Sequence, residues 1–340
     1  MTIEFHAAAE TPAPGEIRPL RDGLFWLRLP LPFALDHVNV WLLDDGDGWT
    51  VIDAGVADRR CRAIWDETLQ GFLKDRPVRR IIATHFHPDH AGLFGELAAR
   101  TGAEPLMSRT EWLMARGLAL DDTPSFLDAG AAYDRAAGLP PALVATRRAR
   151  GNLYAKGVVL PPARISRVEA GDRLRLGGRD WTVRVGRGHA PEMLTFAADG
   201  GDLLIAADQI LPRISPVVGI MAMTPEKDPL EDFLASLDSY LDLPGDTLVL
   251  PSHDAPFVGL HDRVRALKRH HGLRLARCLD AAFEPRTPYS MLPDLFQRRL
   301  DDKQLGFALA ETLAHLVHLE RKGEMTAERD KEGVVRYRRR

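Results

Sequence analysis

The segment Thr84-His85-Phe86-His87-Pro88-Asp89-His90 holds three imidazoles and a carboxylate, and it follows an apolar run at residues 78–83 that predicts a buried strand. Its proline is expected to end that strand, because proline lacks the backbone donor of a ladder. His85 and His87 are two residues apart, so on an extended segment both rings point the same way, while Asp89 and His90 follow at the turn. Zinc and similar metals take imidazole nitrogen and carboxylate oxygen at about 2.0–2.2 Å. The loop is therefore predicted to supply two ligands to each of two adjacent metals, in preference to being a polar loop with chance histidines.

Four further polar residues follow predicted strands elsewhere in the chain. Asp53 follows the strand predicted at residues 49–52, and His189 follows the one at 181–185. Asp208 follows the strand predicted at 203–206, and His253 follows the one at 248–250. Loops at strand ends hold side chains on a rigid scaffold, so this consistent placement favours one common site. The other histidines do not follow a strand in this way and are assigned to no metal: His6, His37, His261, His270, His271, His315 and His318. For His37 and Asn39 the simplest interpretation is a solvent-facing strand position.

Composition limits the class of protein. The chain has 340 residues, which is enough for one large domain and a small one. Its net charge of -3 gives no overall signal for nucleic-acid binding, and its 2 cysteines exclude a disulfide framework. No signal peptide and no run of 18 apolar residues is evident, so a cytoplasmic location without a membrane partner is expected.

The ordered set of motifs resembles the metallo-β-lactamase-fold hydrolases over residues 17–260. The pattern His85-x-His87-x-Asp89-His90 is similar to the signature of that family. By the same resemblance, His189 is the third ligand of the first metal, Asp208 bridges both metals, and His253 is the last ligand of the second. Asp53 resembles an upstream aspartate that would orient a ligand imidazole.

The resemblance implies an α/β fold, a four-layer αββα sandwich in which residues 17–260 form the catalytic domain. Residues 109–160 are predicted to be a helical insertion, at the place where a substrate lid would lie. Residues 261–340 are predicted to form a helical C-terminal region that resembles a small winged helix, with a β-ribbon made from residues 323–326 and 334–337.

The end of the chain leaves two interpretations open. Arg338-Arg339-Arg340 invites a nucleic-acid interpretation, whereas a module that closes the pocket or makes a homodimer contact is the alternative. Acidic residues dilute the basic surface, so the second interpretation is favoured and nucleic acid is not: Asp301, Asp302, Glu311, Glu320, Glu324 and Glu328.

The expected cofactor is a pair of zinc ions, with iron or manganese as the alternative metals. Two metals about 3.5–4 Å apart can share a hydroxide, and they lower the pKa of its parent water towards 7. Asp89 and Asp208 are the expected catalytic residues, and the substrate is expected to be a small ester, thioester or lactone, as in the glyoxalase-II-like part of the family.

Other functions stay open at this point. A phosphodiesterase or endoribonuclease acting on RNA is the first alternative, and a non-catalytic metal-binding interaction protein is the second, which the intact ligand set disfavours. An iron oxidoreductase would need a flavin partner, and no flavin-binding domain is visible. True β-lactamase activity is disfavoured, because those enzymes are typically exported.

Overall fold

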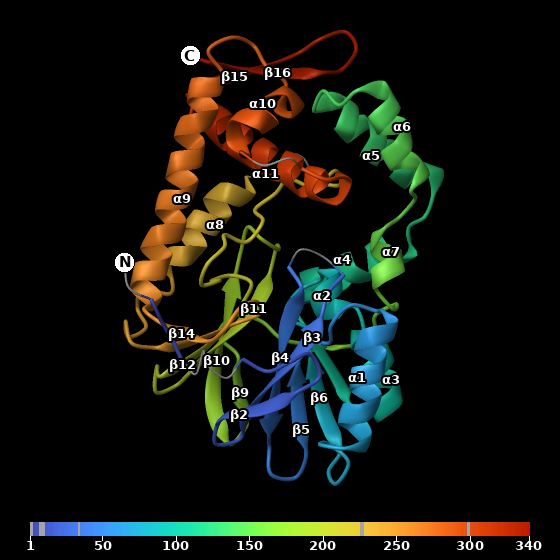
Figure 1. Ribbon diagram of the computed structural model, residues 1–340, viewed down its shortest axis with the longest axis vertical. Coiled ribbons are helices and arrows are strands. Elements are labelled where there is room, and N and C mark those ends of the chain that lie inside the picture. The colour runs from blue at the N-terminus through green and yellow to red at the C-terminus, as the bar shows by residue number, and fades with distance from the viewer. Residues whose placement is uncertain (1–2, 7–10, 33–34, 225–227, 298–299) are drawn as a thin grey trace. The chain divides into compact units, whose positions relative to one another are not determined.

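The computed structural model describes residues 3–6, 11–32, 35–224, 228–297 and 300–340 (Figure 1). The chain separates into two units, which are described one at a time. The first unit contains the described residues up to Leu120 together with residues 153–216 and 239–264. The second contains residues 121–152, the described residues of 217–238, and those of 265–340.

The first unit contains two seven-stranded sheets. The first sheet has the order β2-β3-β4-β5-β6-β7-β8. Its strands are β2 (Ile17–Arg21), β3 (Leu24–Pro30), β4 (His37–Asp44), β5 (Trp49–Ile52), β6 (Val78–Ile82), β7 (Glu104–Met107) and β8 (Ser166–Arg167). Strands β5 to β8 pair in parallel, and the strands before them pair antiparallel. The parallel pairing of β5 with β6 brings the ends of these two strands to the same edge.

The second sheet has the order β1-β14-β13-β12-β11-β10-β9. Its strands are β1 (Glu4–Phe5), β9 (Arg173–Leu176), β10 (Arg179–Gly186), β11 (Met193–Ala198), β12 (Leu203–Ala207), β13 (Leu248–Pro251) and β14 (Phe257–Val258). Strands β12 and β13 pair in parallel, and β10 runs in the same direction because antiparallel β11 lies between it and β12. The strands that precede His189, Asp208 and His253 therefore all end at one edge.

The main core lies between the two sheets. It is built from large apolar side chains of both: Trp26, Trp41, Ile52 and Ile82 from the first sheet, and Trp181, Phe196, Ile205 and Leu250 from the second. Each of these side chains is at most 2% exposed. Two backbone hydrogen bonds join the sheets near the ligand loops, from Leu194 N–H to Thr84 O and from Asn39 N–H to Ser252 O.

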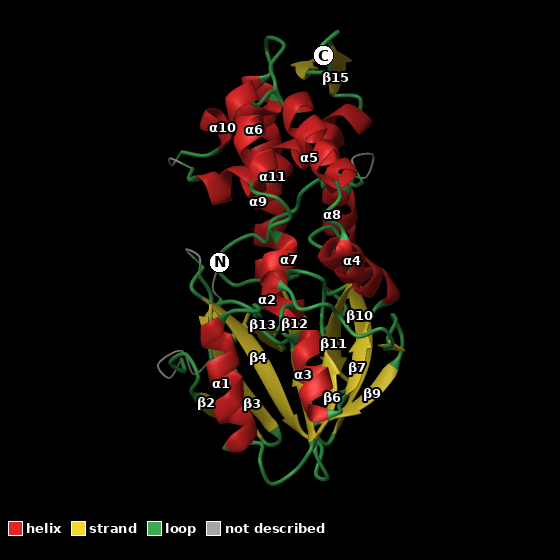
Figure 2. Ribbon diagram, turned by 90° about the vertical axis from the view of Figure 1, so that its right-hand side faces the viewer, coloured by secondary structure: helices red, strands yellow, loops and turns green. Residues whose placement is uncertain are grey.

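Helices of the first unit cover the outer face of the first sheet (Figure 2). They are α1 (Arg59–Gln70), which contacts β3, and α3 (Phe94–Thr101), which contacts β6 and β7. The short α2 (Pro88–Ala91) precedes α3, so a helix begins directly at the proline of the signature. The unit also contains α4 (Arg109–Leu120) and α7 (Tyr154–Gly157). The predicted α/β class with two large sheets is confirmed.

The second unit is mostly helical. Its elements are α5 (Pro124–Ala136), α6 (Pro141–Ala149), α8 (Pro229–Asp238), most of α9 (Leu260–Ala281), α10 (Pro288–Leu295), α11 (Asp302–Arg321), β15 (Met325–Arg329) and β16 (Val335–Arg339). The predicted β-ribbon is β15–β16, which pair antiparallel. The predicted insertion at 109–160 is divided, because α4 and α7 belong to the first unit whereas α5 and α6 belong to the second. Among the described helices, none combines the length and the apolar composition needed to cross a bilayer.

Candidate metal centre

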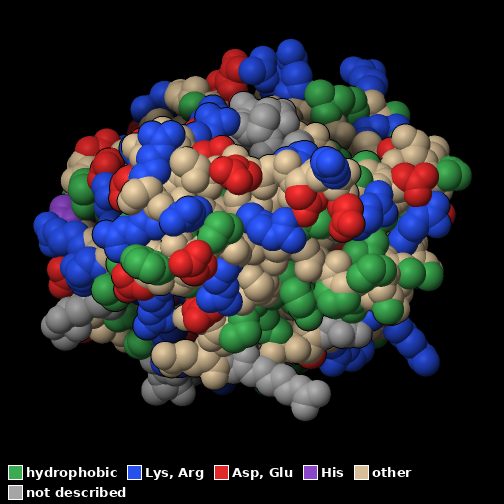
Figure 3. Space-filling view, turned by 90° about the horizontal axis from the view of Figure 1, so that it is seen from above, with side chains coloured by type: hydrophobic (Ala, Val, Ile, Leu, Met, Phe, Trp, Pro, Cys, Tyr) green, Lys and Arg blue, Asp and Glu red, His purple; other side chains and the backbone are tan. Residues whose placement is uncertain are grey.

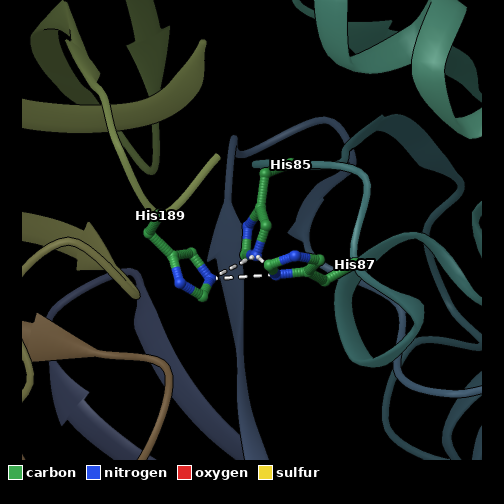
Figure 4. Close-up of side chains that lie close together, drawn as sticks. All are labelled: His85, His87 and His189. Carbon is green, nitrogen blue, oxygen red and sulfur yellow. Dashed lines mark hydrogen bonds between the residues drawn. The ribbon is translucent and has the colours of Figure 1, made fainter. Parts of the chain in front are cut away.

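The loops at the shared strand edge bring the predicted ligands together. One group consists of His85, His87 and His189 (Figure 4). His87 Nδ1 lies 2.9 Å from His85 Nε2 and 2.9 Å from His189 Nε2, and the last two atoms are 3.3 Å apart. Nitrogen ligands of one tetrahedral zinc ion are about 3.3 Å apart, given bonds of 2.0–2.1 Å. Three ring nitrogens therefore converge at a spacing close to that of a three-histidine metal site.

A second group consists of Asp89, His90 and His253. Asp89 Oδ2 lies 3.5 Å from His90 Nε2 and 3.5 Å from His253 Nε2. Both histidines are at most 2% exposed. This second group offers two nitrogens and one oxygen to a cation.

Asp208 faces both groups with different oxygens. Its Oδ2 lies 3.3 Å from His189 Nε2, whereas its Oδ1 lies 3.4 Å from His253 Nε2 and 3.5 Å from His90 Nε2. The side chain follows a β-bulge in β12 and is buried. A carboxylate in this position can contact two neighbouring cations at once.

Two buried polar atoms at this point lack a hydrogen-bond partner: His90 Nε2 and Asp208 Oδ1. Buried polar atoms are nearly always paired, so two unpaired polar atoms 3.5 Å apart call for an explanation. A metal ion satisfies both, because imidazole nitrogen and carboxylate oxygen are ligands of zinc. The residues present therefore fit a divalent metal.

Hydrogen bonds behind the imidazoles determine which nitrogen faces the centre. His253 Nδ1–H donates to the backbone oxygen of His37 over 2.8 Å, and His90 Nδ1–H donates to Asp53 over 2.8 Å. Thr84 donates its hydroxyl proton to Asp53, so this hydroxyl accepts from His85 Nδ1–H, 3.0 Å away. In its neutral form, each of the three imidazoles therefore has its lone pair on the Nε2 atom that faces the centre, which is the arrangement that metal-binding histidines need.

The charges of the centre favour a cation. Burial alone would raise the pKa of Asp89, but the imidazoles of His90 and His253 outweigh burial and hold that pKa below its ordinary value. The same two imidazoles hold the pKa of Asp208 well below its ordinary value against burial. Burial lowers the pKa of His90, yet the surrounding carboxylates raise it well above its ordinary value. Both aspartates are therefore ionised at neutral pH, and positive charge is stabilised between them.

Strained backbone also marks this centre. Among the described residues other than glycine, three have positive φ: Asp53 at 67°, Ala207 at 46° and Asp254 at 71°. Asp53 supports His90, and the other two residues directly adjoin Asp208 and His253 in sequence. Such conformations typically cost about 1–3 kcal/mol each and concentrate at functional sites.

Several supporting residues were not found from the sequence. Glu111 of α4 is fully buried and accepts hydrogen bonds from the backbone N–H groups of Phe86 and Glu192. The Tyr154 hydroxyl donates to the Phe86 oxygen over 2.5 Å, so its role is to hold the loop. Burial raises the pKa of Glu111 to about 7. A glutamate at the start of an amphipathic helix carries no sequence signal for this role.

The solvent-facing interpretation of His37 and Asn39 is wrong. His37 is 8% exposed and Asn39 is 0% exposed. Asn39 Nδ2 donates to the backbone oxygens of Pro251 and Asp254, and His37 Nε2 accepts from Asp254 N–H. Both residues thus shape the loop that presents His253.

Two family models match separate parts of the chain. Residues 34–253 match the family model described as Metallo-beta-lactamase superfamily, and residues 275–340 match Metallo-beta-lactamase-like, C-terminal domain. A beta-lactamase domain protein from Burkholderia ambifaria is 36% identical, with a TM-score of 0.92 over 99% of this chain and 98% of that one.

Two curated relatives have functional names. The probable metallo-hydrolase YqjP of Bacillus subtilis is 26% identical over 88% of this chain and 93% of its own length. The acyl-coenzyme A thioesterase MBLAC2 of Gallus gallus is 28% identical over 51% of this chain and 57% of its own length. On the match of residues 34–253 to the family model, this chain belongs to the metallo-β-lactamase superfamily.

Proposed function

We propose that the protein is a hydrolase that uses two divalent metal ions, most simply zinc, to cleave a small thioester or a related ester or lactone. One observation supports this proposal above the others: the two oxygens of Asp208 face two separate groups of ligands. A single-metal site would need only one of these groups. The two ions would be held by His85, His87 and His189 on one side, by Asp89, His90 and His253 on the other, and by Asp208 between them.

Metal ions bound there supply a Lewis acid and a water of lowered pKa. The protein supplies position and charge. Asp89 and Asp208 stay ionised, because neighbouring imidazoles hold their pKa values below the ordinary value against burial. Thr84 and Asp53 fix two imidazoles through their Nδ1 protons, and Glu111 fixes the backbone of the loop. A preorganised set of this kind need not rearrange when charge develops on a substrate.

The name of one relative indicates which bond of the substrate is cleaved. The Gallus gallus relative is named as an acyl-coenzyme A thioesterase, which favours a thioester over a phosphodiester. RNA is disfavoured as the substrate because acidic and basic side chains are interspersed on the surface drawn in Figure 3. We therefore place small acyl thioesters first, and esters and lactones after them.

The test combines metal analysis with a substrate panel. We expect close to two ions per chain at the centre described above, and turnover of acyl thioesters, lactones or activated esters by the zinc-loaded protein. His85→Ala should lower both metal content and turnover, because His85 is one of the three imidazoles of the first ligand group. The matched control is His6→Ala, an exposed histidine outside the centre, which should change neither quantity.

Two results would overturn this proposal. One is a protein that binds no divalent metal when loaded with zinc. The other is cleavage of long RNA or of an activated phosphodiester without hydrolysis of any thioester, ester or lactone.

A further inference from the structure

A second buried cluster of metal-type side chains lies in the second unit. His271 lies on α9, and Glu311 and His315 are four residues apart on α11, so both point from one face of that helix. His271 and His315 are 0% exposed and Glu311 is 8% exposed. All three belong to the second unit, whereas the ligands of the centre described above belong to the first.

The donor atoms of this cluster converge. One atom from each of the three side chains lies within 4.8 Å of the other two, and His271 Nδ1 lies 3.1 Å from His315 Nε2. Two nitrogens on one tetrahedral zinc ion are about 3.3 Å apart, given bonds of 2.0–2.1 Å. The two imidazoles are thus already spaced nearly as ligands of a single ion.

The tautomer of His315 suits a metal. Its Nδ1–H donates to the backbone oxygen of Glu311 over 2.7 Å. The lone pair of His315 is therefore on Nε2, the atom that faces His271. Metal-binding histidines almost always donate their other ring proton in this way, which fixes the ring and raises its basicity.

The ion pair between Arg274 and Glu311 does not prevent the cluster from binding a cation. Its Nη1 lies 2.9 Å from a Glu311 carboxylate oxygen, yet the same buried nitrogen lacks a hydrogen bond of good geometry. A carboxylate has two oxygens, so one can stay near Arg274 while the other binds a cation. The ion pair and a metal are compatible with each other.

We propose that His271, Glu311 and His315 form an additional metal site that binds one zinc-type divalent ion and cross-links α9 to α11. Two imidazoles and one carboxylate are a ligand set that zinc accepts, and three protein ligands leave one position for water. The two helices also share an apolar cluster, which includes Cys278 on α9 and Leu316 on α11. An ion between these helices would stabilise the second unit without taking part in the chemistry of the first.

The alternative to a metal site is a hydrogen bond between two neutral histidines, in which His271 Nδ1–H donates to His315 Nε2. Zinc binding by the whole 340-residue chain distinguishes a metal site from this hydrogen bond. We would strip it of metal, load it with zinc, remove the excess and measure the zinc-to-chain ratio. We expect His271→Gln and His315→Gln each to lose one ion per chain. Glutamine can still donate and accept hydrogen bonds, so these variants separate metal binding from simple pairing.

The matched control is His270→Gln, which alters the exposed neighbouring histidine and should keep the wild-type ratio. Reloaded with zinc, His315→Gln should still hold the ions of the first unit and turn over any substrate of the wild-type protein. This distinguishes failure of the additional site from failure of the proposed hydrolase function. A zinc ratio equal in the wild type, His271→Gln and His315→Gln would overturn the additional site.

Hydrogen exchange of the wild-type chain tests the additional site without any variant, so it applies even where a variant fails to fold. At a free zinc concentration about 100 times Kd, amides of α9 and α11 that exchange by opening this site should slow about a hundredfold. Equal exchange rates of the α9 and α11 amides with and without zinc would overturn the additional site.

Discussion

Asp53 accepts the Nδ1 proton of His90 over 2.8 Å, and it does so from a backbone conformation with a φ of 67°. The same carboxylate also accepts from the backbone N–H and the hydroxyl of Thr84, and that hydroxyl contacts His85 Nδ1. One aspartate that follows β5 therefore orients an imidazole in each of the two ligand groups, one directly and one through Thr84.

Asp53→Asn should weaken metal binding and lower turnover. Asparagine tolerates positive φ, so the backbone can keep its conformation. With its oxygen towards the Thr84 N–H, the amide nitrogen would face His90 Nδ1, which must then accept and carry its proton on Nε2 instead. Loss of a partner behind a ligand typically costs about 10–100-fold in metal affinity or activity. Competition with a chromophoric chelator measures the dissociation constants.

Thr84→Ser keeps the hydroxyl and is the control for this substitution. It should bind metal like the wild type. Equal metal affinity in Asp53→Asn and the wild type would show that the carboxylate does not orient His90.

Asp208→Asn should damage turnover far more than folding. An amide carries no charge to offset two cations, and only one of its two polar atoms can accept. Loss of a residue that acts only from behind a ligand typically costs up to about 100-fold. Because Asp208 faces both ligand groups directly, we expect its replacement to lower kcat/KM by more than about 100-fold. Steady-state kinetics, metal analysis and thermal unfolding of one preparation measure the three quantities. Near-native turnover in this variant would contradict the bridging role.

Glu111→Gln should change how stability depends on pH. Burial raises the pKa of Glu111 to about 7 in the folded protein, against about 4.3 in an unfolded chain. A raised folded pKa stabilises the protein fully below the unfolded value, and that stabilisation is lost as pH rises through about 7. The stability of the wild type relative to the variant should therefore fall between about pH 4.3 and 7, by at most about 1.4 kcal/mol per pH unit.

Chemical denaturation of the metal-free proteins at several pH values measures this difference. Glu67→Gln on the exposed face of α1 is the matched control for the loss of one carboxylate. A difference between the wild type and Glu111→Gln that is constant with pH would show that Glu111 stays ionised in the folded protein.

Replacing Arg338, Arg339 and Arg340 with glutamine should leave thioester turnover within about twofold of the wild type, since all three are exposed. Truncation before residue 289 would be a poorer test. It removes Met291, Leu316 and Tyr337, which pack in one apolar cluster with Cys278 of α9, and so would also disturb the packing of that helix. The readouts are turnover and RNA binding at several salt concentrations. Phosphate contacts make binding fall steeply with salt, so such RNA binding by the wild type alone would support the nucleic-acid alternative.

The candidate metal ligands were predictable from local sequence, because each of these residues follows a strand and strand ends are recognisable from apolar runs. Parallel pairing then brings those ends to one edge, as β5 with β6 and β12 with β13 show. The α/β class was implied by the resemblance of the ordered motifs to the metallo-β-lactamase-fold hydrolases.

Other features were decided only by contacts between distant segments. Glu111 and Asn39 look like ordinary helix and strand residues, and their roles exist only because α4 and β4 lie beside ligand loops far away in sequence. Likewise, α5 and α6 belong with the C-terminal helices because Ala131 and Val144 pack in one apolar cluster with Leu309. An amphipathic pattern shows that a helix has an apolar face, but hydrophobic attraction is non-directional, so the pattern cannot name the surface that covers it.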